Sequence, residues 1–173
     1  MLDKLQRIDE IIVFFIQNHC RSPVLDKVMV FITSLGNGGF LWICFAIYLI
    51  IFKDRTKREK SGVFLIASIF AAMFLGDEIL KPLIGRVRPC NQFPQVELLI
   101  TCPISPSFPS GHTMVGFASA TALFYHYRRL GIIAYIIASL IAFSRIYLFV
   151  HYPSDILGGI IFGVLTALTT ILL

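Results

Sequence analysis

Five long apolar runs alternate with short polar segments along the chain. The runs are residues 35–52, 61–80, 112–127, 130–150 and 156–173. Charged side chains are nearly absent from them. Each run reaches, or nearly reaches, the roughly 20 residues that an α-helix needs to cross about 30 Å of hydrocarbon. The pattern therefore predicts an all-α fold, an integral membrane helical bundle with about five transmembrane helices.

The N-terminal segment, residues 1–34, has an amphipathic pattern instead. Apolar residues recur there at helical spacing, with charged residues between them: Leu2, Leu5, Ile8, Ile12 and Phe15. This pattern predicts an amphipathic helix that lies in the membrane interface. A sixth span built from residues 11–35 is the alternative. A cleaved signal peptide fits poorly, because acidic residues interrupt the apolar stretch and no small-residue cleavage site follows.

The composition agrees with a membrane protein. Hydrophobic residues make up 57% of the 173 residues and charged residues 14%, whereas soluble domains average roughly 45–50% and 25%. A soluble bundle is excluded because the apolar runs leave too little polar surface, and 13% aromatic residues exclude intrinsic disorder. The length fits a single membrane-embedded domain, 1–173. Despite the net charge of +5, no nucleic acid partner is expected of so apolar a chain.

Lysine and arginine predict the orientation of the chain. Five of the eight residues 53–60 are basic, and Arg128 and Arg129 form the other short basic turn. The positive-inside rule places both in the cytoplasm. The outer segments 81–112 and 144–155 then meet on the opposite face. We expect a multi-pass protein of the plasma (inner) membrane whose outer segments face the periplasm or the outside.

The outer loop 82–109 contains six of the eight prolines, which predicts a stiff, irregular segment. Its apolar residues 96–100 either rest on the lipid surface or join the core. Cys90 and Cys102 lie in the same loop, where an oxidising compartment permits a disulfide between them. Two free thiols are the alternative.

The other two cysteines, Cys20 and Cys44, lie in or beside apolar segments. We expect both to be inert core residues, because free cysteine behaves as a small apolar side chain. No cysteine and histidine spacing in the chain suggests a zinc site.

Four cations lie where the outer ends of the helices are predicted: Lys81, Arg86, Arg88 and Arg145. Charge at this depth is costly unless it is paired or functional. One nearby carboxylate, Asp155, leaves a net positive pocket. A phosphate group would neutralise this pocket, and guanidinium forks match phosphate oxygens. Snorkelling of the side chains to anionic lipid headgroups is the alternative.

The sequence Pro109-Ser110-Gly111-His112 precedes and begins the third apolar run. A tight turn that starts a helix presents backbone N–H groups at the positive helix end, which is an anion site. Ser110 could add a hydroxyl donor. A simple helix N-cap is the alternative explanation of this motif.

His151 and Asp155 are four residues apart at the start of the last run. The spacing lets the carboxylate accept a hydrogen bond from one ring nitrogen, which leaves the other free as a nucleophile or base. A structural pair is the alternative. His112, beside the phosphate-like pocket, favours catalysis. Two histidines and one aspartate could also bind zinc, but the converging cations would repel a dication, so we expect no metal.

These clusters resemble the three signature motifs of the phosphatidic acid phosphatase type 2 superfamily, a family of membrane lipid phosphatases. The motif K-x6-R-P is matched by Lys81, Arg88 and Pro89, P-S-G-H by Pro109, Ser110, Gly111 and His112, and S-R-x5-H-x3-D by Ser144, Arg145, His151 and Asp155. All three match in order and without a departure. The resemblance also agrees with a helical membrane bundle.

The resemblance implies a mechanism without metal or cofactor. His151 would attack phosphorus and form a phosphohistidine, and Asp155 would orient it. His112 would protonate the leaving oxygen and then activate water. The phosphate oxygens would be held by Lys81, Arg88, Ser110, the backbone of Gly111, and Arg145. Arg86 lies outside the motifs, and headgroup recognition is the role expected of it.

The function implied is hydrolysis of a lipid phosphate or diphosphate at the outer membrane face. Candidate substrates are undecaprenyl diphosphate, lipid A 1-phosphate, phosphatidylglycerol phosphate and phosphatidic acid. A lipid phosphotransferase would use the same phosphohistidine and is the alternative. A lipid transporter fits less well, because no internal repeat is visible and the charges gather at one face.

Overall fold

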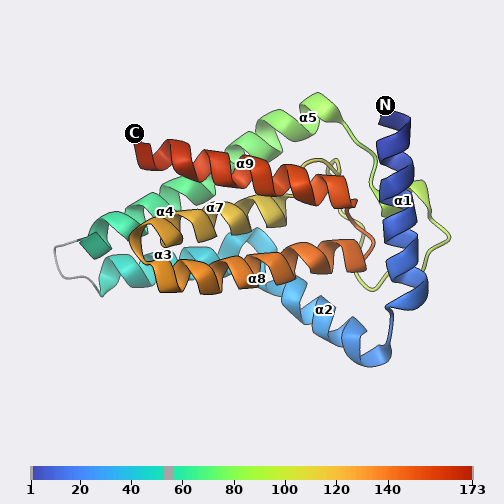
Figure 1. Cartoon of the computed structure of the whole chain (residues 1–173), viewed down its shortest axis with the longest axis horizontal. Coiled ribbons are helices and arrows are strands. Elements are labelled where there is room, and N and C mark those ends of the chain that lie inside the picture. Colours follow the sequence, from blue (N-terminus) through green and yellow to red (C-terminus); the bar gives the residue numbers. More distant parts are fainter. Residues whose placement is uncertain (1, 53–56, 173) are drawn as a thin grey trace.

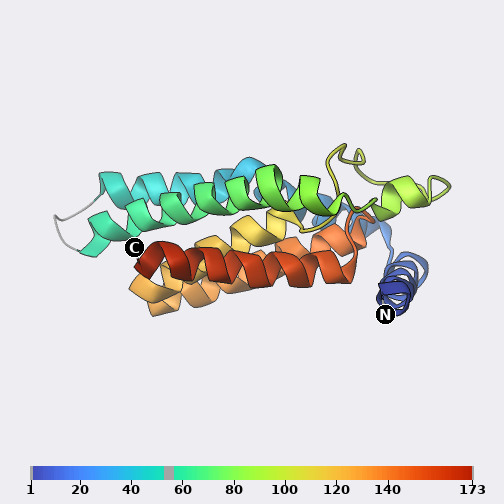
Figure 2. The same cartoon turned by 90° about the horizontal axis from the view of Figure 1, so that it is seen from above.

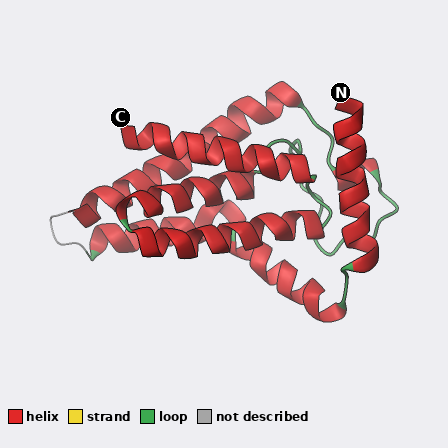
Figure 3. Cartoon of the chain, viewed as in Figure 1, coloured by secondary structure: helices red, strands yellow, loops and turns green. Residues whose placement is uncertain are grey.

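The computed structural model describes residues 2–52 and 57–172, and this part of the chain folds into helices without a β-strand (Figure 3). In chain order the elements are α1 (Leu2–His19), α2 (Pro23–Leu35), η1 (Asn37–Gly39), α3 (Phe40–Ile51), α4 (Lys57–Met73), η2 (Phe74–Leu80), α5 (Lys81–Ile84), α6 (Pro89–Gln92), α7 (Gly111–His126), α8 (Arg128–Tyr147) and α9 (Pro153–Leu172). η1 is a 3₁₀ turn and η2 is π-helical. The predicted all-α class is confirmed.

The bundle is built around α7. This helix contacts α4, α8 and α9 (Figures 1 and 2), and every residue from 113 to 123 is buried. Glycine allows close approach: a Cβ at Gly163 of α9 would lie 2.4 Å from the carbonyl oxygen of Met114. Small residues at such contacts are how helices associate in a bilayer. Tight packing therefore fixes the position of the N-terminal end of α7.

Several of the helices are apolar enough to cross a membrane. Among the described residues, Ser61–Gln92, Arg128–Tyr147 and Pro153–Leu172 each qualify by length and hydropathy. Pro23–Leu35 and Asn37–Ile51 add a fourth span if this pair, bent by 46°, is counted as one. α7 has 16 residues and lies inside the bundle. The protein is a multi-pass membrane bundle, as predicted.

The first apolar run, 35–52, is not one helix, contrary to the prediction. α2 ends at Leu35, and Gly38 and Gly39 then take φ values of 57° and 67°. Glycine adopts this left-handed conformation without steric cost, so the chain turns here. α3 begins only at Phe40. The turn brings η1 next to α7.

α1 lies across one end of the bundle (Figures 1 and 2). Residues 11–35 do not form a single span, since α1 ends at His19 and α2 begins at Pro23. Proline suits the first turn of a helix, where its missing N–H is not needed. The chain therefore changes direction between the two helices.

The two faces of α1 meet different surroundings. Ile8, Ile11 and Phe15 are exposed, whereas Asp9 and Val13 are buried against the bundle. An exposed apolar face on a helix that crosses the end of a membrane bundle suits the lipid interface. The buried carboxylate of Asp9 needs partners, because a buried charge without them is costly.

The outer loop closes over the same end of the bundle. The sulfur atoms of Cys90 and Cys102 are joined at 2.03 Å. Residues 98–100 pack against the buried cluster that contains Tyr147. Of the two alternatives for residues 96–100, the structure supports the core.

Cys44 is exposed, so its predicted place in the core is wrong. The buried residues of α3 are Trp42, Ala46 and Leu49. They share one helical face, and Cys44 lies on the other. Cys20 is half-buried and packs at the edge of a core cluster.

The orientation prediction rests partly on residues 53–56, which lie outside the described residues. The other basic turn is described. Arg128 is the first residue of α8, and α8 starts at the end of the bundle away from α1 (Figure 1). The two outer segments thus lie at the opposite end from this basic turn.

Candidate active site

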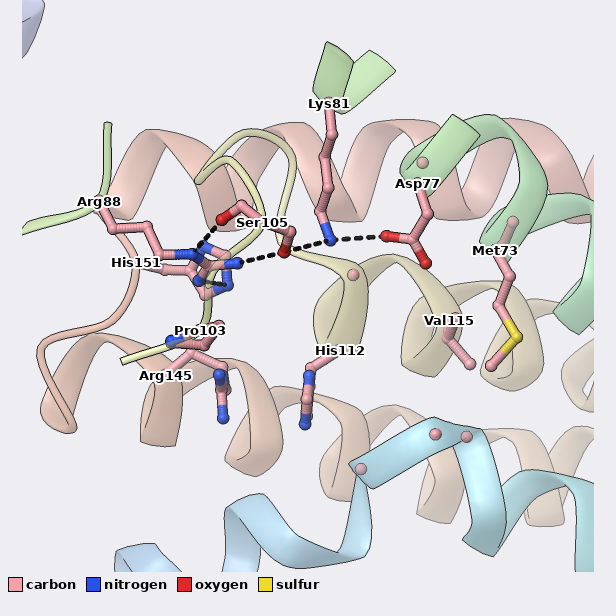
Figure 4. Close-up of a pocket in the computed structure, with 16 residues that line it drawn as sticks. Met73, Asp77, Lys81, Arg88, Pro103, Ser105, His112, Val115, Arg145 and His151 are labelled. Carbon is pink, nitrogen blue, oxygen red and sulfur yellow. Dashed lines mark hydrogen bonds and ion pairs between the residues drawn. The ribbon is translucent and has the colours of Figure 1, made fainter. Parts of the chain in front are cut away.

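The three predicted clusters meet around a cavity of about 210 Å³ (Figure 4). The α8–α9 connection, which carries His151, lies at the α1 end of the bundle (Figure 1). The charged and histidine side chains of the motifs that line it are Lys81, Arg88, His112, Arg145 and His151. They come from α5, the α5–α6 connection, the start of α7, the end of α8 and the α8–α9 connection. Segments far apart in the sequence therefore converge on one cavity, as predicted.

His151 lies in the irregular connection between α8 and α9 and is buried. Its Nδ1 is 3.5 Å from Oδ2 of Asp155 and its Nε2 is 2.9 Å from Nη1 of Arg88. A guanidinium can only donate hydrogen bonds, so Nε2 is the acceptor of this contact. Nε2 therefore carries its lone pair on the side of the cavity, while Nδ1 faces the carboxylate.

Asp155, in the first turn of α9, is fully buried but well partnered. Its Oδ2 accepts hydrogen bonds from the Ser107 hydroxyl at 2.5 Å and the Tyr152 backbone N–H at 2.8 Å. Its Oδ1 accepts from Arg86 at 2.5 Å. These donors stabilise the ionised carboxylate beside His151.

Burial lowers the pKa of His151 from 6.5 to about 3, although the hydrogen bond with Asp155 opposes this shift. Desolvation penalises the charged imidazolium more than the carboxylate can compensate. His151 is consequently neutral at physiological pH. A neutral imidazole with an acceptor nitrogen toward the cavity is the form that a nucleophile requires.

Arg88 is fixed by several acceptors of the outer loop and of the α8–α9 connection. Its Nε donates to the Ser105 carbonyl at 2.6 Å, and its Nη1 donates to the Val150 carbonyl at 2.9 Å. Nη2 donates to the Ser105 hydroxyl at 3.1 Å and the Pro106 carbonyl at 3.2 Å. These contacts hold the guanidinium beside His151. Ser105 is a residue that sequence analysis did not identify.

Lys81 enters the cavity from α5 and pairs with an acidic residue one turn earlier. Its Nζ lies 2.6 Å from Oδ1 of Asp77 and 3.5 Å from the Ser105 hydroxyl (Figure 4). Asp77 also lines the cavity, and sequence analysis assigned it no role. Its spacing of four residues from Lys81 was the signal available, since such residues share a helical face.

Arg145, near the end of α8, is buried and only partly satisfied. Its Nη1 donates to the Thr33 hydroxyl at 2.6 Å, while its Nε has no hydrogen-bond partner among the described residues. A buried donor without a partner is unfavourable. An anion in the cavity could accept from this side chain, which makes the arrangement suited to phosphate. Thr33 belongs to α2 and has no motif signature.

His112, in the first turn of α7, contacts the glycine turn of η1. Its Nε2 is 3.0 Å from Oδ1 of Asn37. A Cβ at Gly36 would lie 2.7 Å from Cδ2 of His112, so the turn packs directly on the ring. Asn37 was not identified from the sequence. A polar residue beside two glycines within an apolar run was the available signal.

Ser110 and Gly111 form the start of α7. The Ser110 side chain is buried, accepts a hydrogen bond from Thr113 at 3.0 Å, and makes no capping bond to α7. Gly111 lines the cavity, and a Cβ there would lie 3.5 Å from Nζ of Lys81. The backbone at this helix start thus borders a cation at the cavity wall, a suitable place for an anion.

Arg86 is not among the residues that line the cavity. Its Nη1 donates to Asp155 and to Ser154, and its Nη2 donates to Asp9 and to Gln6. The structure therefore places Arg86 behind Asp155, among protein partners, and not toward the space where a headgroup would lie.

The described residues contain no group of three histidine, cysteine or acidic side chains placed to hold a metal ion. The zinc site weighed from the sequence thus has no ligand set in this part of the chain. Lysine and arginine side chains supply the positive charge of the cavity.

Comparison with known proteins agrees with this geometry. The model of the PAP2 superfamily matches residues 61–173. An undecaprenyl-diphosphatase of Sulfolobus acidocaldarius is 34% identical over 151 residues, which are 87% of this chain and 71% of that protein. The crystal structure of Aquifex aeolicus LpxE superimposes with a TM-score of 0.81 at 29% identity, covering 94% of this chain and 93% of that one.

A second solved structure, a PAP2-type phosphatidylglycerolphosphate phosphatase from Bacillus subtilis, gives a TM-score of 0.80 at 30% identity. It covers 96% of this chain and 84% of the Bacillus chain. The predicted motifs, the cavity that they form, the family match and the shared fold agree, and the chain belongs to the PAP2 superfamily.

Proposed function

We propose that this protein is a lipid phosphatase that hydrolyses a lipid phosphate monoester or diphosphate through a phosphohistidine on His151. The observation that carries the proposal is the position of His151. Its Nε2 faces Arg88 at the cationic cavity, and its Nδ1 faces the buried Asp155. A nucleophile, an orienting carboxylate and cations for the developing charge are thus present together.

In the first step the Nε2 lone pair of His151 attacks phosphorus. A P–N bond forms as the bond between phosphorus and the lipid oxygen breaks, and His112 donates a proton to that oxygen. Lys81, Arg88 and Arg145 stabilise the charge on the phosphoryl oxygens. Asp155 stabilises the positive charge that develops on the imidazole ring.

In the second step His112 takes a proton from water, and the resulting hydroxide attacks the phosphohistidine. The P–N bond breaks, its electron pair returns to Nε2, and inorganic phosphate leaves. The protein is then in its starting state. Every proton in the cycle moves through His112, so no metal-bound water is required.

The lining of the cavity supports a lipid as the substrate. Beside the cations, it includes the apolar side chains of Ala72, Met73 and Val115 from α4 and α7. A phosphate at the cationic side would leave its lipid chain next to these residues. Relatives named as undecaprenyl-diphosphatase, phosphatidylglycerophosphatase B and lipid A 1-phosphatase support the same class of substrate.

The candidates are therefore undecaprenyl diphosphate, lipid A 1-phosphate, phosphatidylglycerol phosphate and phosphatidic acid. We place the reaction at the outer face of the plasma membrane, because the α8–α9 connection, whose His151 lines the cavity, lies at the opposite end of the bundle from the basic start of α8 (Figure 1). The exposed apolar face of α1 would rest in the interface on that side.

The test uses purified protein in lipid vesicles with each of the four substrates, without an added phosphate acceptor. His151→Ala should abolish phosphate release and the acid-labile labelling of the protein. His19→Ala is the matched control, because His19 lies on α1 and its Nδ1 bonds the Phe15 carbonyl of the same helix. Activity in His151→Ala, or a strict requirement for an added acceptor, would overturn the proposal.

A further inference from the structure

A buried carboxylate from α1 lies behind the candidate catalytic residues. Asp9 is 1% exposed. Its Oδ1 accepts from the backbone N–H of Ser154 at 2.9 Å, and its Oδ2 accepts from Arg86 at 2.7 Å and from the Ser154 hydroxyl. Ser154 belongs to the first turn of α9, where backbone N–H groups have no partner inside the helix. Asp9 therefore caps α9 from a different helix.

Arg86 connects this carboxylate to the candidate active site. Its Nη1 binds Oδ1 of Asp155 at 2.5 Å, while its Nη2 binds Asp9. The guanidinium also lies 4.3 Å from the centre of the Tyr152 ring. Planar guanidinium with several donors can bridge two carboxylates in fixed directions, which a lysine cannot. The contacts form a continuous line from Asp9 through Arg86 and Asp155 to His151.

We propose that Asp9 and Arg86 are positioning residues. They set the net charge beside the His151 ring and orient the carboxylate of Asp155 toward Nδ1 of His151. This inference rests on the proposed function. With Asp9 present, the two carboxylates and one guanidinium carry a net charge of about −1 next to the ring. That charge balances the positive charge that His151 gains when it attacks phosphorus.

Without the charge of Asp9, Arg86 neutralises Asp155 alone, and the positive charge on His151 has no counterpart. Arg86 would then also draw the carboxylate toward itself, away from Nδ1. Both effects raise the barrier of the chemical step. Neither effect changes Lys81, Arg88 or Arg145, which would bind the phosphate from the opposite side of the ring. The rate of chemistry and the binding of substrate should consequently respond differently.

α1 thus has two roles on two faces. Ile8, Ile11 and Phe15 are exposed on the face that suits lipid, while Asp9 points into the bundle. Asp9 and Ser154 are 145 residues apart in the sequence. The helix that crosses the end of the bundle therefore completes a network around the reacting residues from outside the three motifs.

The experiment compares Asp9→Asn, Asp9→Glu and Glu10→Gln in lipid vesicles. Asp9→Asn keeps the shape and removes the charge, and should lower kcat about tenfold with KM unchanged, the effect of one pKa unit of charge interaction. Asp9→Glu keeps the charge and should recover most of kcat. Glu10→Gln removes the same charge from the next residue, which bonds Gln6 and Gln92 and reaches Arg86 only through Gln6, and should lower kcat far less than Asp9→Asn does.

Arg86→Lys keeps the positive charge but cannot bridge both carboxylates, and should lower kcat as Asp9→Asn does. Thermal unfolding in detergent shows whether each variant is folded. A normal kcat in Asp9→Asn, with His151→Ala inactive, would overturn this inference but not the proposed function. A fall in kcat with a parallel rise in KM and lower unfolding temperature would also overturn it, since it indicates a structural role. Activity in His151→Ala would instead contradict the proposed function.

Discussion

Residues 61–172 and residues 2–52 contribute differently to the same site. The first region carries the three motifs and supplies the charged and histidine side chains that line the cavity, including Lys81 and His151. The second region carries no motif, yet it contacts three basic side chains of the first. Those contacts are Asp9 to Arg86 at 2.7 Å, Thr33 to Arg145 at 2.6 Å and Asn37 to His112 at 3.0 Å.

The difference shows that the candidate reacting groups all lie in one region, whereas the side chains that contact them come from both regions. A cation or histidine at a cavity wall needs a fixed direction, because small misplacements are costly in rate. In this protein α1, α2 and η1 contribute such contacts to Arg86, Arg145 and His112. Substitutions in the two regions should therefore differ in size and in the kinetic parameter that they change.

Among the substitutions that distinguish the two regions, Asp155→Asn should have the largest effect on the rate. The asparagine amide places an N–H donor where the carboxylate of Asp155 now accepts hydrogen bonds from Arg86 and Ser107. The substitution also removes the negative charge beside His151. We expect kcat to fall about 10⁴-fold, the scale seen when the aspartate of a catalytic triad becomes asparagine. Single-turnover phosphate release measures this. Asp26→Asn, which alters a carboxylate bound to Arg21, is the control.

Thr33→Val tests the N-terminal contact to Arg145, a cation that lines the cavity. It removes the hydroxyl that accepts from Arg145 and keeps the volume of the side chain. Since a hydrogen bond to a charged group contributes about 1.5–3 kcal/mol, we expect kcat/KM to fall about tenfold or more. Arg145→Ala should cost about 10²–10³-fold.

The double variant of these two residues completes the test. If Thr33 acts through Arg145, the loss of kcat/KM in Thr33→Val should largely disappear when Arg145 is already alanine. Independent, additive losses would show that Thr33 does not position Arg145, and would weaken the division between the two regions.

Asn37→Ala should have a smaller effect. It removes the amide oxygen 3.0 Å from Nε2 of His112, and a neutral hydrogen bond contributes about 0.5–1.5 kcal/mol. We expect kcat to fall about three- to tenfold with little change in KM. Asn91→Ala, in α6 of the outer loop, is the control. An unchanged kcat would show that His112 is oriented by the bundle alone.

The smallest expected effect concerns pH. The pKa of His151 is lowered by burial from 6.5 to about 3, so its ring should remain neutral as pH falls from about 7 to about 5. Ring-nitrogen NMR of the protein in detergent should include a histidine signal that does not titrate there and that is missing from His151→Ala. A titration near 6.5 would contradict the burial of His151.

The same shift makes stability depend on pH. Between pH 6.5 and about 3, the unfolded chain binds a proton at His151 that the folded protein does not. The contribution of this residue to the free energy of unfolding is therefore fully present above pH 6.5 and decreases as pH falls through this window. His151→Ala should reduce that dependence.

The sequence by itself determined the class of fold and predicted the residues of the candidate site. Apolar runs predict helices because each helix must satisfy its own backbone in a bilayer. The spacings of the three motifs predict which charges lie at helix ends. The region 81–155 could be interpreted as a phosphate site because its cations have few carboxylates near them in sequence.

Two predictions from local sequence patterns in the first apolar run were wrong. The hydropathy pattern predicts one helix over residues 35–52, but Gly38 and Gly39 adopt a left-handed turn. Cys44 is as apolar as its neighbours, and only the packing of α3 shows that it faces outward. Such a choice depends on which side of a helix meets a neighbour, and an apolar run has no polar face to mark it.

The tertiary structure alone decided how the residues of the candidate site are held. Asp9, Thr33 and Asn37 are 77, 112 and 75 residues away from the side chains that they contact. Periodicity and motif spacing report interactions within a few turns of one helix, whereas these contacts depend on where α1 and η1 come to lie. These contacts can be identified only from the folded structure, in which the N-terminal helices lie against the end of the bundle.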